Sequence, residues 1–169
     1  LDIVALGTIC DMVPVKGINR LLILRGLEVL NKKKNIGLSA LINLLGIDAL
    51  INAYHLGYYI GPCINAGGRV GDSKLGVNLL TSEDKVEASY IANKLKSYND
   101  LRREIEEKVF KEANELLSSK DIKFKTGEVL LVAKEGWHPG VIGIVASRLV
   151  NKFRKPVLVI SINGLDSKG

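Results

Sequence analysis

Trp137 and His138, near the end of the chain, are the residues best suited to chemistry, and they stand in a turn between Gly136 and Gly140. Histidine can exchange protons near neutral pH, and an indole ring can stack on a nucleic-acid base. The glycines let the backbone approach a ligand closely, and the unpaired N–H groups of a helix that begins near Gly140 would favour a phosphate. The glycine spacing matches neither a Walker loop nor a dinucleotide-binding fingerprint. The turn therefore predicts an anion-binding site, and an ordinary strand-to-helix crossover explains the glycines equally well.

A second group suited to chemistry is the carboxylate of Asp11. It follows a run, beginning at Ile3, that is apolar nearly all round and so predicts a buried helix or strand. Pro14 disfavours helix at Val13, which predicts a break just after Asp11. A carboxylate in an apolar setting needs a compensating partner. From the residues alone, capping of the next element or pairing with Arg20 is favoured over metal binding.

Residues 57–72 contain five glycines and one proline, which predicts an irregular, shaped loop. Asn65 and Arg69 in this stretch could meet a phosphate or a carboxylate. A rigid hinge in which Arg69 pairs with Asp72 is the alternative interpretation.

The elements that must position these residues follow from hydrophobic periodicity. Glu128–Ala133 and 156–160 are strand-like runs on either side of the turn and its helix, so the end of the chain is predicted to be strand, loop, helix, strand. Residues from about 82 to 118 contain no glycine or proline, and their apolar residues recur at intervals of three and four. This pattern predicts one long amphipathic helix, begun by a capping box at Thr81–Asp84 and about 50 Å long. Such a helix should bridge two bodies, and a coiled-coil dimerisation element is the alternative.

The far face of this predicted helix alternates basic and acidic residues, which indicates ion pairs facing solvent and not a nucleic-acid stripe. Its charged residues include Lys94, Lys96, Arg103, Glu104, Glu106, Glu107, Lys108, Lys111 and Glu112.

Composition indicates a soluble globular protein, with 47% hydrophobic and 25% charged residues in a chain of 169. The net charge of +6 is compatible with a polyanionic partner, although Lys32–Lys34 is interpreted as a solvated loop. Cys10 and Cys63 have no metal-binding spacing and indicate a reducing cytoplasm. No apolar run is long enough to cross a membrane, so no membrane partner is expected.

Three stretches resemble RecJ-type single-strand-specific exonucleases of the DHH phosphoesterase family. Leu1–Val15 is similar to the last catalytic motif of the DHH domain, 57–72 to the family's Asn-Ala-Ala-Gly-Arg motif, and Gly136–Leu149 to the opening motif of the DHH-associated domain. Two departures are Gly67, where alanine is usual, and Cys63, where the family commonly has arginine and therefore a charge.

The resemblance implies an α/β fold in three parts. Residues 1–31 would be the C-terminal end of the DHH catalytic domain. Residues 32–118 would be a helical connector that includes the long helix at about 82–118. Residues 119–169 would begin the DHH-associated domain and form its first β-α-β unit.

The resemblance also implies a function: hydrolysis of single-stranded DNA from the 5′ end, in DNA repair and recombination, with two Mn²⁺ or Mg²⁺ ions. Asp11 matches a metal ligand, and His138 is the catalytic candidate. The nucleic-acid-binding candidates are Asn65, Arg69, Trp137, Gly140 and Arg148. Core packing is the alternative role for Trp137, a structural turn for His138, and simple surface exposure for Arg148.

Most ligands of the two-metal centre are expected before Leu1, so we expect the 169-residue chain to be inactive alone. The expected partner is single-stranded DNA, with a single-strand-binding protein as a further candidate, in the cytoplasm. The oligomeric state stays open. A non-enzymatic module that binds nucleic acid, or a partner through its long helix, is the alternative function.

Overall fold

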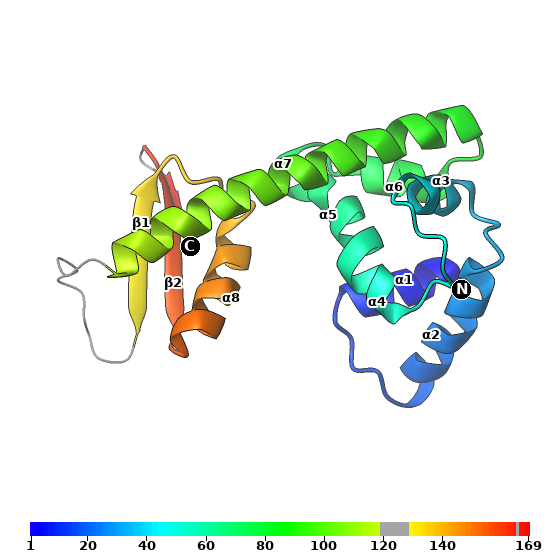
Figure 1. The fold of residues 1–169 in the computed structure, drawn as a ribbon, viewed down its shortest axis with the longest axis horizontal. Helices are drawn as coiled ribbons and strands as arrows, with labels where there is room; N and C mark the ends of the chain where they lie inside the picture. The colour runs from blue at the N-terminus through cyan, green and yellow to red at the C-terminus, as the bar shows by residue number, and fades with distance from the viewer. Residues whose placement is uncertain (119–128, 165) are drawn as a thin grey trace. The chain divides into compact units, whose positions relative to one another are not determined.

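The computed structural model describes residues 1–118, 129–164 and 166–169 (Figure 1). They form two compact units, Leu1–Asn99 and Asp100–Gly169. The first unit is helical and the second contains a three-stranded sheet, so the predicted α/β fold is confirmed. The domain start predicted at 119 and the strand start predicted at Glu128 lie outside the described residues.

The first unit is built from helices around one apolar core. They are α1 (Asp2–Cys10), α2 (Gly17–Leu30), α3 (Ile36–Leu44), α4 (Ala53–His55), the π-helix η1 (Leu56–Ile60), α5 (Gly61–Val70), α6 (Lys74–Thr81) and the start of α7 (Lys85–Ser118). Local signals explain their ends: the Asn35 side chain caps α3 by accepting a 2.8 Å hydrogen bond from the Leu38 N–H. The core includes the fully buried Leu41, Ile42, Leu56, Ile60, Leu79 and Leu95.

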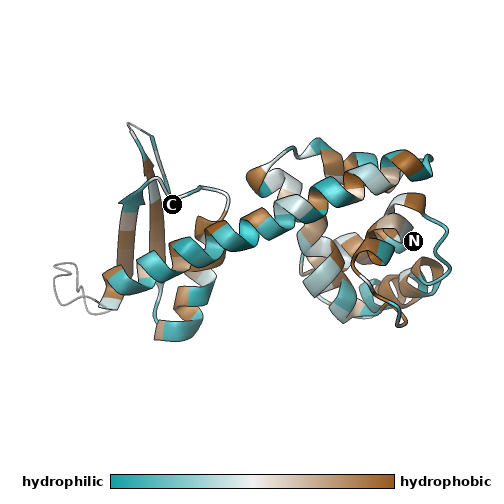
Figure 2. Ribbon diagram, turned by 45° about the horizontal axis from the view of Figure 1, so that its top comes forward, coloured by the Kyte–Doolittle hydropathy of each residue, from teal (hydrophilic) through white to brown (hydrophobic). Residues whose placement is uncertain are grey.

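The long helix predicted near 82–118 is confirmed as α7, which has 34 residues. Its start differs from the prediction, because Thr81 ends α6 and Asp84 caps α7 through a 2.7 Å hydrogen bond from the Val86 N–H. Its buried residues recur at helical spacing and include Ala88, Ala92, Leu95, Val109 and Ala113. Figure 2 shows the resulting mixture of hydrophobic and hydrophilic residues along α7. Like every other helix in the described ranges, it lacks the combination of length and hydropathy needed to cross a membrane.

The irregular loop predicted at 57–72 is wrong, because η1 and α5 cover most of this stretch. Its glycines serve close packing. A Cβ at Gly61 would lie 2.3 Å from Cys10 Sγ and 2.8 Å from the Leu56 carbonyl oxygen. Pro62 lies in the first turn of α5, where its missing N–H would have no partner in the helix. Glycine and proline therefore mark a helix crossing here and not a turn.

The apolar run that begins at Ile3 forms α1, but the expectation of burial all round is wrong. Ala5 and Leu6 are buried, whereas Ile3 and Val4 are 43% and 42% exposed. Neighbouring helices of this unit cover one side of α1, and its other side remains open to solvent.

The second unit contains the predicted β-α-β motif, which is confirmed. It consists of β1 (Leu130–Glu135), α8 (Ile142–Phe153) and β2 (Val157–Asn163), followed by the short β3 (Asp166–Lys168). β1 pairs in parallel with β2, and β2 pairs antiparallel with β3. Ile142, Val145 and Leu149 form the buried stripe of α8. The turn that follows β1 therefore carries Trp137 and His138 at the carboxyl end of that strand.

We expect Gly61→Ala to lower the free energy of unfolding by roughly 1–3 kcal/mol, because the added methyl group would overlap Cys10 and Leu56. Gly7→Ala is the matched control. No atom lies within 4 Å of a Cβ built at Gly7 in α1, so that change should stabilise the chain by about 0.5–1 kcal/mol. Urea denaturation followed by circular dichroism measures both, and equal stabilities would contradict the close crossing.

Candidate functional site

Asp11 and Asn65 line the same pocket of the first unit, which has a volume of about 160 Å³. Asp11 follows the last turn of α1, where its N–H donates a 2.9 Å hydrogen bond to the Gly7 carbonyl. Asn65 lies one turn into α5. Gly61 allows α5 to lie against Cys10, so this crossing is what brings the carboxylate and the amide together.

Asp11 is exposed, and the structure shows no ion pair between it and Arg20 among the described residues. The pairing considered for Asp11 on sequence grounds is therefore not observed. The neighbouring thiol of Cys10 is not a competing nucleophile, because burial and then the charge of Asp11 raise its pKa. The free carboxylate is the group in this pocket best suited to a hard cation.

A complete metal centre is not formed by the described residues, because none of their His, Cys, Asp and Glu side chains gather in groups of three or more. Asp11 could supply one oxygen ligand, which fits Mg²⁺ or Mn²⁺ in donor type but not in number. The described part of the chain thus offers part of a metal site at most.

Arg69 lies one helical turn after Asn65, so both project from the same side of α5, and both are exposed. Cys63 is on the opposite side: it is 1% exposed and belongs to the apolar core. Where the resembling family commonly has an arginine, this chain therefore has a buried core residue.

His138 lies in the second unit, in a pocket of about 400 Å³ between the turn and the β2–β3 hairpin. Its Nδ1 accepts a 3.0 Å hydrogen bond from the Gly140 N–H. In the neutral ring the proton is therefore on Nε2, which can donate to a phosphate oxygen. Gly140 thus serves to orient the imidazole.

The hairpin contributes four polar residues to the same pocket that the sequence had not indicated: Ser161, Asn163, Asp166 and Lys168. Asn163 and Gly164 follow a strand-like run, and Gly164 has a φ of 57°. Asn-Gly after such a run is a hairpin signal, and it could have predicted that the chain folds back here.

Trp137 is 4% exposed, so its ring has no open face on which a base could stack. Its Nε1–H donates a 2.9 Å hydrogen bond to Glu112, and its carbonyl accepts one from the Ser161 hydroxyl. Glu112 also pairs with Lys134 at 2.9 Å. The geometry supports the alternative role of Trp137 in the core, where it fixes the turn to α7 and β2.

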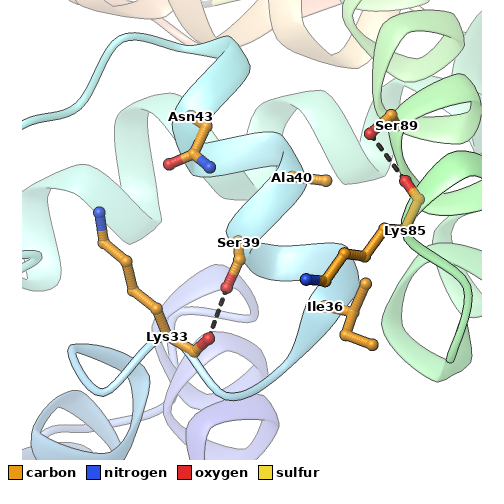
Figure 3. Close-up of a pocket in the computed structure, with 7 residues that line it drawn as sticks. All are labelled: Lys33, Ile36, Ser39, Ala40, Asn43, Lys85 and Ser89. Carbon is orange, nitrogen blue, oxygen red and sulfur yellow. Dashed lines mark hydrogen bonds between the residues drawn. The ribbon is translucent and has the colours of Figure 1, made fainter.

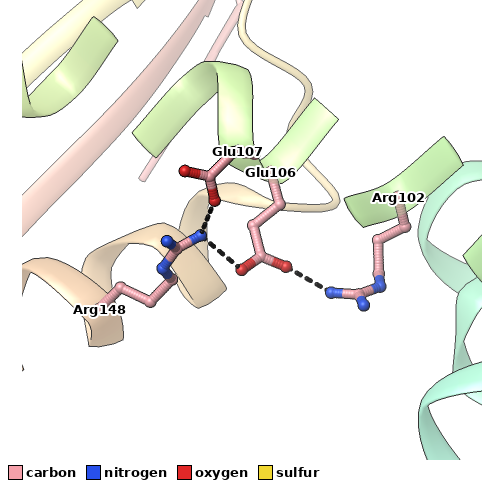
Figure 4. A network of polar contacts seen from close by, with 4 residues as sticks. All are labelled: Arg102, Glu106, Glu107 and Arg148. Carbon is pink, nitrogen blue, oxygen red and sulfur yellow. Dashed lines mark hydrogen bonds and ion pairs between the residues drawn. The ribbon is translucent and has the colours of Figure 1, made fainter. Parts of the chain in front are cut away.

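Arg148 does not line the His138 pocket but lies in a polar network between α8 and α7 (Figure 4). It pairs with Glu107 at 2.8 Å and Glu106 at 3.1 Å, and its guanidinium lies 3.9 Å from the ring centre of Phe110. Glu106 also pairs with Arg102. Partial desolvation would lower the pKa of Arg148, but the hydrogen bonds that it donates to Glu107 and Glu106, with the charges of these two residues, outweigh desolvation and raise that pKa.

These contacts correct in part the prediction that the acidic residues of α7 form ion pairs with their neighbours in solvent. Glu106 does pair with Arg102 one turn away on α7, but Glu106 and Glu112 also bind groups of α8, β1 and the turn after β1. A charge pattern along one helix shows which residues are available for pairing but not which other element supplies the partner.

Comparison with known proteins finds close relatives for nearly the whole chain, although no family model matches it. The chain is 39% identical over 164 residues to the single-stranded-DNA-specific exonuclease RecJ of Bacillus subtilis. The aligned region covers 96% of this chain and 20% of that protein. The RecJ of Escherichia coli is 38% identical over 168 residues, covering 97% and 29%. The chain thus spans between a fifth and a third of the length of these relatives.

Solved structures match over the same extent. The crystal structure of RecJ in complex with Mg²⁺ from Thermus thermophilus aligns with a TM-score of 0.83 and 31% identity, over 95% of this chain and 25% of that one. A crystal structure of an exonuclease RecJ bound to manganese aligns with a TM-score of 0.81 and 29% identity. That alignment covers 95% of this chain and 40% of the solved one.

We expect the stability of the second unit to depend on the ionisation of Glu112. Hydrogen bonds from Lys134 and then Trp137 lower the pKa of Glu112 below its ordinary value of 4.5. Because the folded state favours the charged form, this contribution is present above about pH 4.5 and is lost as the pH falls through the lower folded pKa.

Trp137 is the single tryptophan, so its emission reports this environment during urea unfolding. Glu112→Gln should lower stability at pH 7 by about 1 kcal/mol and flatten the fall between neutral and acidic pH. Glu115→Gln, on an exposed residue of the same helix, is the control. If the stability of both variants depended on pH as that of the unmodified protein does, Glu112 would not hold the turn.

Proposed function

The chain belongs to the RecJ family, as its motifs predicted, and on that premise we propose that it is a segment of a metal-dependent exonuclease that degrades single-stranded DNA from the 5′ end. The observation that carries the proposal is 34–39% identity, over at least 95% of this chain, to relatives named single-stranded-DNA-specific exonucleases. On the same family basis we assign the enzyme to cytoplasmic DNA repair and recombination, with a single-strand-binding protein as a candidate partner.

Asp11 would contribute one carboxylate to a centre that holds two Mg²⁺ or Mn²⁺ ions, with the other ligands supplied from outside this chain. Such ions, when bound, activate water and neutralise charge on the phosphate. Asn65, in the same pocket, can donate a side-chain N–H to a phosphate oxygen next to Asp11. Arg69, one turn further along α5, would add positive charge on the same side of the helix.

The second unit would hold the strand through His138. Its Nε2–H is free to donate because Nδ1 is occupied by the Gly140 N–H. Asn163 and Lys168 border the same pocket and can add an amide and an ammonium donor. We assign Trp137 and Arg148 to positioning, since their polar groups are bound to glutamates of α7.

The division proposed for the domains follows the family: the end of the catalytic domain at 1–31, the connector at 32–118 and the start of the associated domain from 119. The exposed apolar side of α1 supports this division, because a surface of that kind is typical of a helix that packs against further protein.

We expect Asp11→Asn, in the longer protein that carries this segment, to lower turnover on the order of a hundredfold or more, because an amide is a weaker ligand for a hard cation. Release of nucleotides from a labelled single strand with Mg²⁺ or Mn²⁺ measures it. Asp48→Asn, an exposed acid outside the pocket, is the control and should be silent. The 169-residue chain alone should release nothing, and metal-dependent release by it would contradict the proposed ligand set.

His138→Ala should lower turnover roughly ten- to a hundredfold in the same assay, because a donor to the phosphate is lost. His138→Gln should recover part of the activity, since its amide can donate from a similar position. In the 169-residue chain, where Trp137 is the single tryptophan, its emission should stay unchanged in both variants, which separates loss of function from loss of folding. Unaltered turnover and DNA affinity in His138→Ala would remove His138 from the site.

A further inference from the structure

A pocket of about 380 Å³ on the first unit carries unpaired positive charge and has no role in the function proposed above (Figure 3). It lies along α3 and beside the first two turns of α7. Lys33 reaches it from the turn before α3, Lys85 from the first turn of α7, and Ser39, Asn43 and Ser89 complete its polar lining.

The charge of this pocket is uncompensated within the described part of the chain. None of its lining residues is acidic, and neither Lys33 nor Lys85 forms an ion pair with a described residue. Two acids close to Lys85 in sequence bind other groups: the Asp84 carboxylate accepts from the Val86 N–H, and the Glu87 carboxylate accepts from the Ser82 hydroxyl. The two ammonium groups are therefore available to an anion.

The turn that carries Lys33 is held in an unusual conformation. Lys33 has a φ of 51°, which is uncommon for a residue with a side chain. The Ser39 hydroxyl stabilises it by sharing its single proton between the carbonyls of Lys33, at 2.9 Å, and Asn35, at 2.7 Å. Backbone in this region is common where a helix ends, and Lys33 follows the end of α2, where its N–H donates to the Leu30 carbonyl. Here it presents Lys33 beside the beginning of α3.

The polar groups of the pocket differ in whether they still have a hydrogen-bond donor available for a ligand. The hydroxyl protons of Ser39 and Ser89 are already donated to backbone carbonyls, the latter to Lys85 at 2.8 Å. Lys33, Lys85 and the Asn43 amide therefore remain as donors. A set of donors with two full charges suits a phosphate group.

We propose that this pocket binds a backbone phosphate of the DNA strand, an inference that rests on the function proposed above for the identity of the strand. Lys32 and Lys34 flank Lys33 outside the pocket and can reach adjacent phosphates, which favours an extended polyanion over a single small ion. The pocket contacts the sugar-phosphate backbone and does not read bases, so it acts equally on all sequences.

The test uses a double variant, Lys33→Gln with Lys85→Gln, in the longer protein that carries this segment. Glutamine removes the charge and keeps most of the side-chain stem. Lys108→Gln with Lys111→Gln, on exposed residues of α7 outside the pocket, removes the same net charge and is the matched control. Fluorescence anisotropy with a labelled oligothymidylate, in KCl from about 0.05 to 0.5 M, measures affinity and its salt dependence.

We expect the double variant to bind roughly tenfold more weakly near 0.1 M salt. The slope of log affinity against log salt should fall by about 0.7, because one phosphate contact on a single strand accounts for about that much. The control should change neither value appreciably. Oligonucleotides of different sequence should show the same loss.

Three other outcomes would overturn the assignment in distinguishable ways. If the double variant behaves like the control while the unmodified protein binds DNA, the pocket has no such role and the proposed function stands. If the unmodified protein binds no single-stranded DNA, the proposed function fails and the inference fails with it. If polyglutamate binds as tightly as the oligonucleotide and shows the same loss, the pocket takes acidic polypeptides and the DNA assignment is wrong.

Discussion

The arrangement of the first unit depends on a crossing between α5 and α1 that leaves no room for a side chain. Gly61 lies so close to Cys10 that even a methyl group would overlap its sulfur. This contact places the end of α1 beside the first turns of α5, and so brings Asp11 and Asn65 to one pocket. A bulkier residue would push the helices apart and separate the carboxylate from the amide, so the chemistry proposed for this unit depends on the packing of a glycine.

In the second unit, carboxylates of α7 hold the turn after β1 and the helix α8 in place. Glu112 holds the indole of Trp137, and Glu106 and Glu107 hold the guanidinium of Arg148. The turn and α8 are thereby attached to the same helix at two places. These contacts also hold the turn that carries His138. Glu112 of α7 fixes one side of that turn through the Trp137 indole, and Ser161 of β2 fixes the other through the Trp137 carbonyl.

Four basic residues of the described ranges differ in whether they form an ion pair. Arg148 and Lys134 are paired with acids and contribute to structure, whereas Lys33 and Lys85 line a pocket that has no acid. A paired cation offers little to a polyanion, because binding would first have to break the existing pair. Lys33 and Lys85 are therefore better placed to meet a polyanion than the paired Arg148 and Lys134, and net charge alone does not reveal this difference.

The sequence by itself determined the family, the long helix and the β-α-β unit, because motifs and hydrophobic periodicity are local and survive without knowledge of neighbours. It also indicated Asp11, Asn65 and His138 as chemically competent residues. Tertiary structure alone decided what Gly61 does, because the same glycine-rich pattern suits a loop or a close helix crossing until the opposing helix is known. Tertiary structure likewise decided that Trp137 binds Glu112 and that Arg148 binds Glu106. The partner of a long side chain depends on which elements meet and not on spacing along one helix.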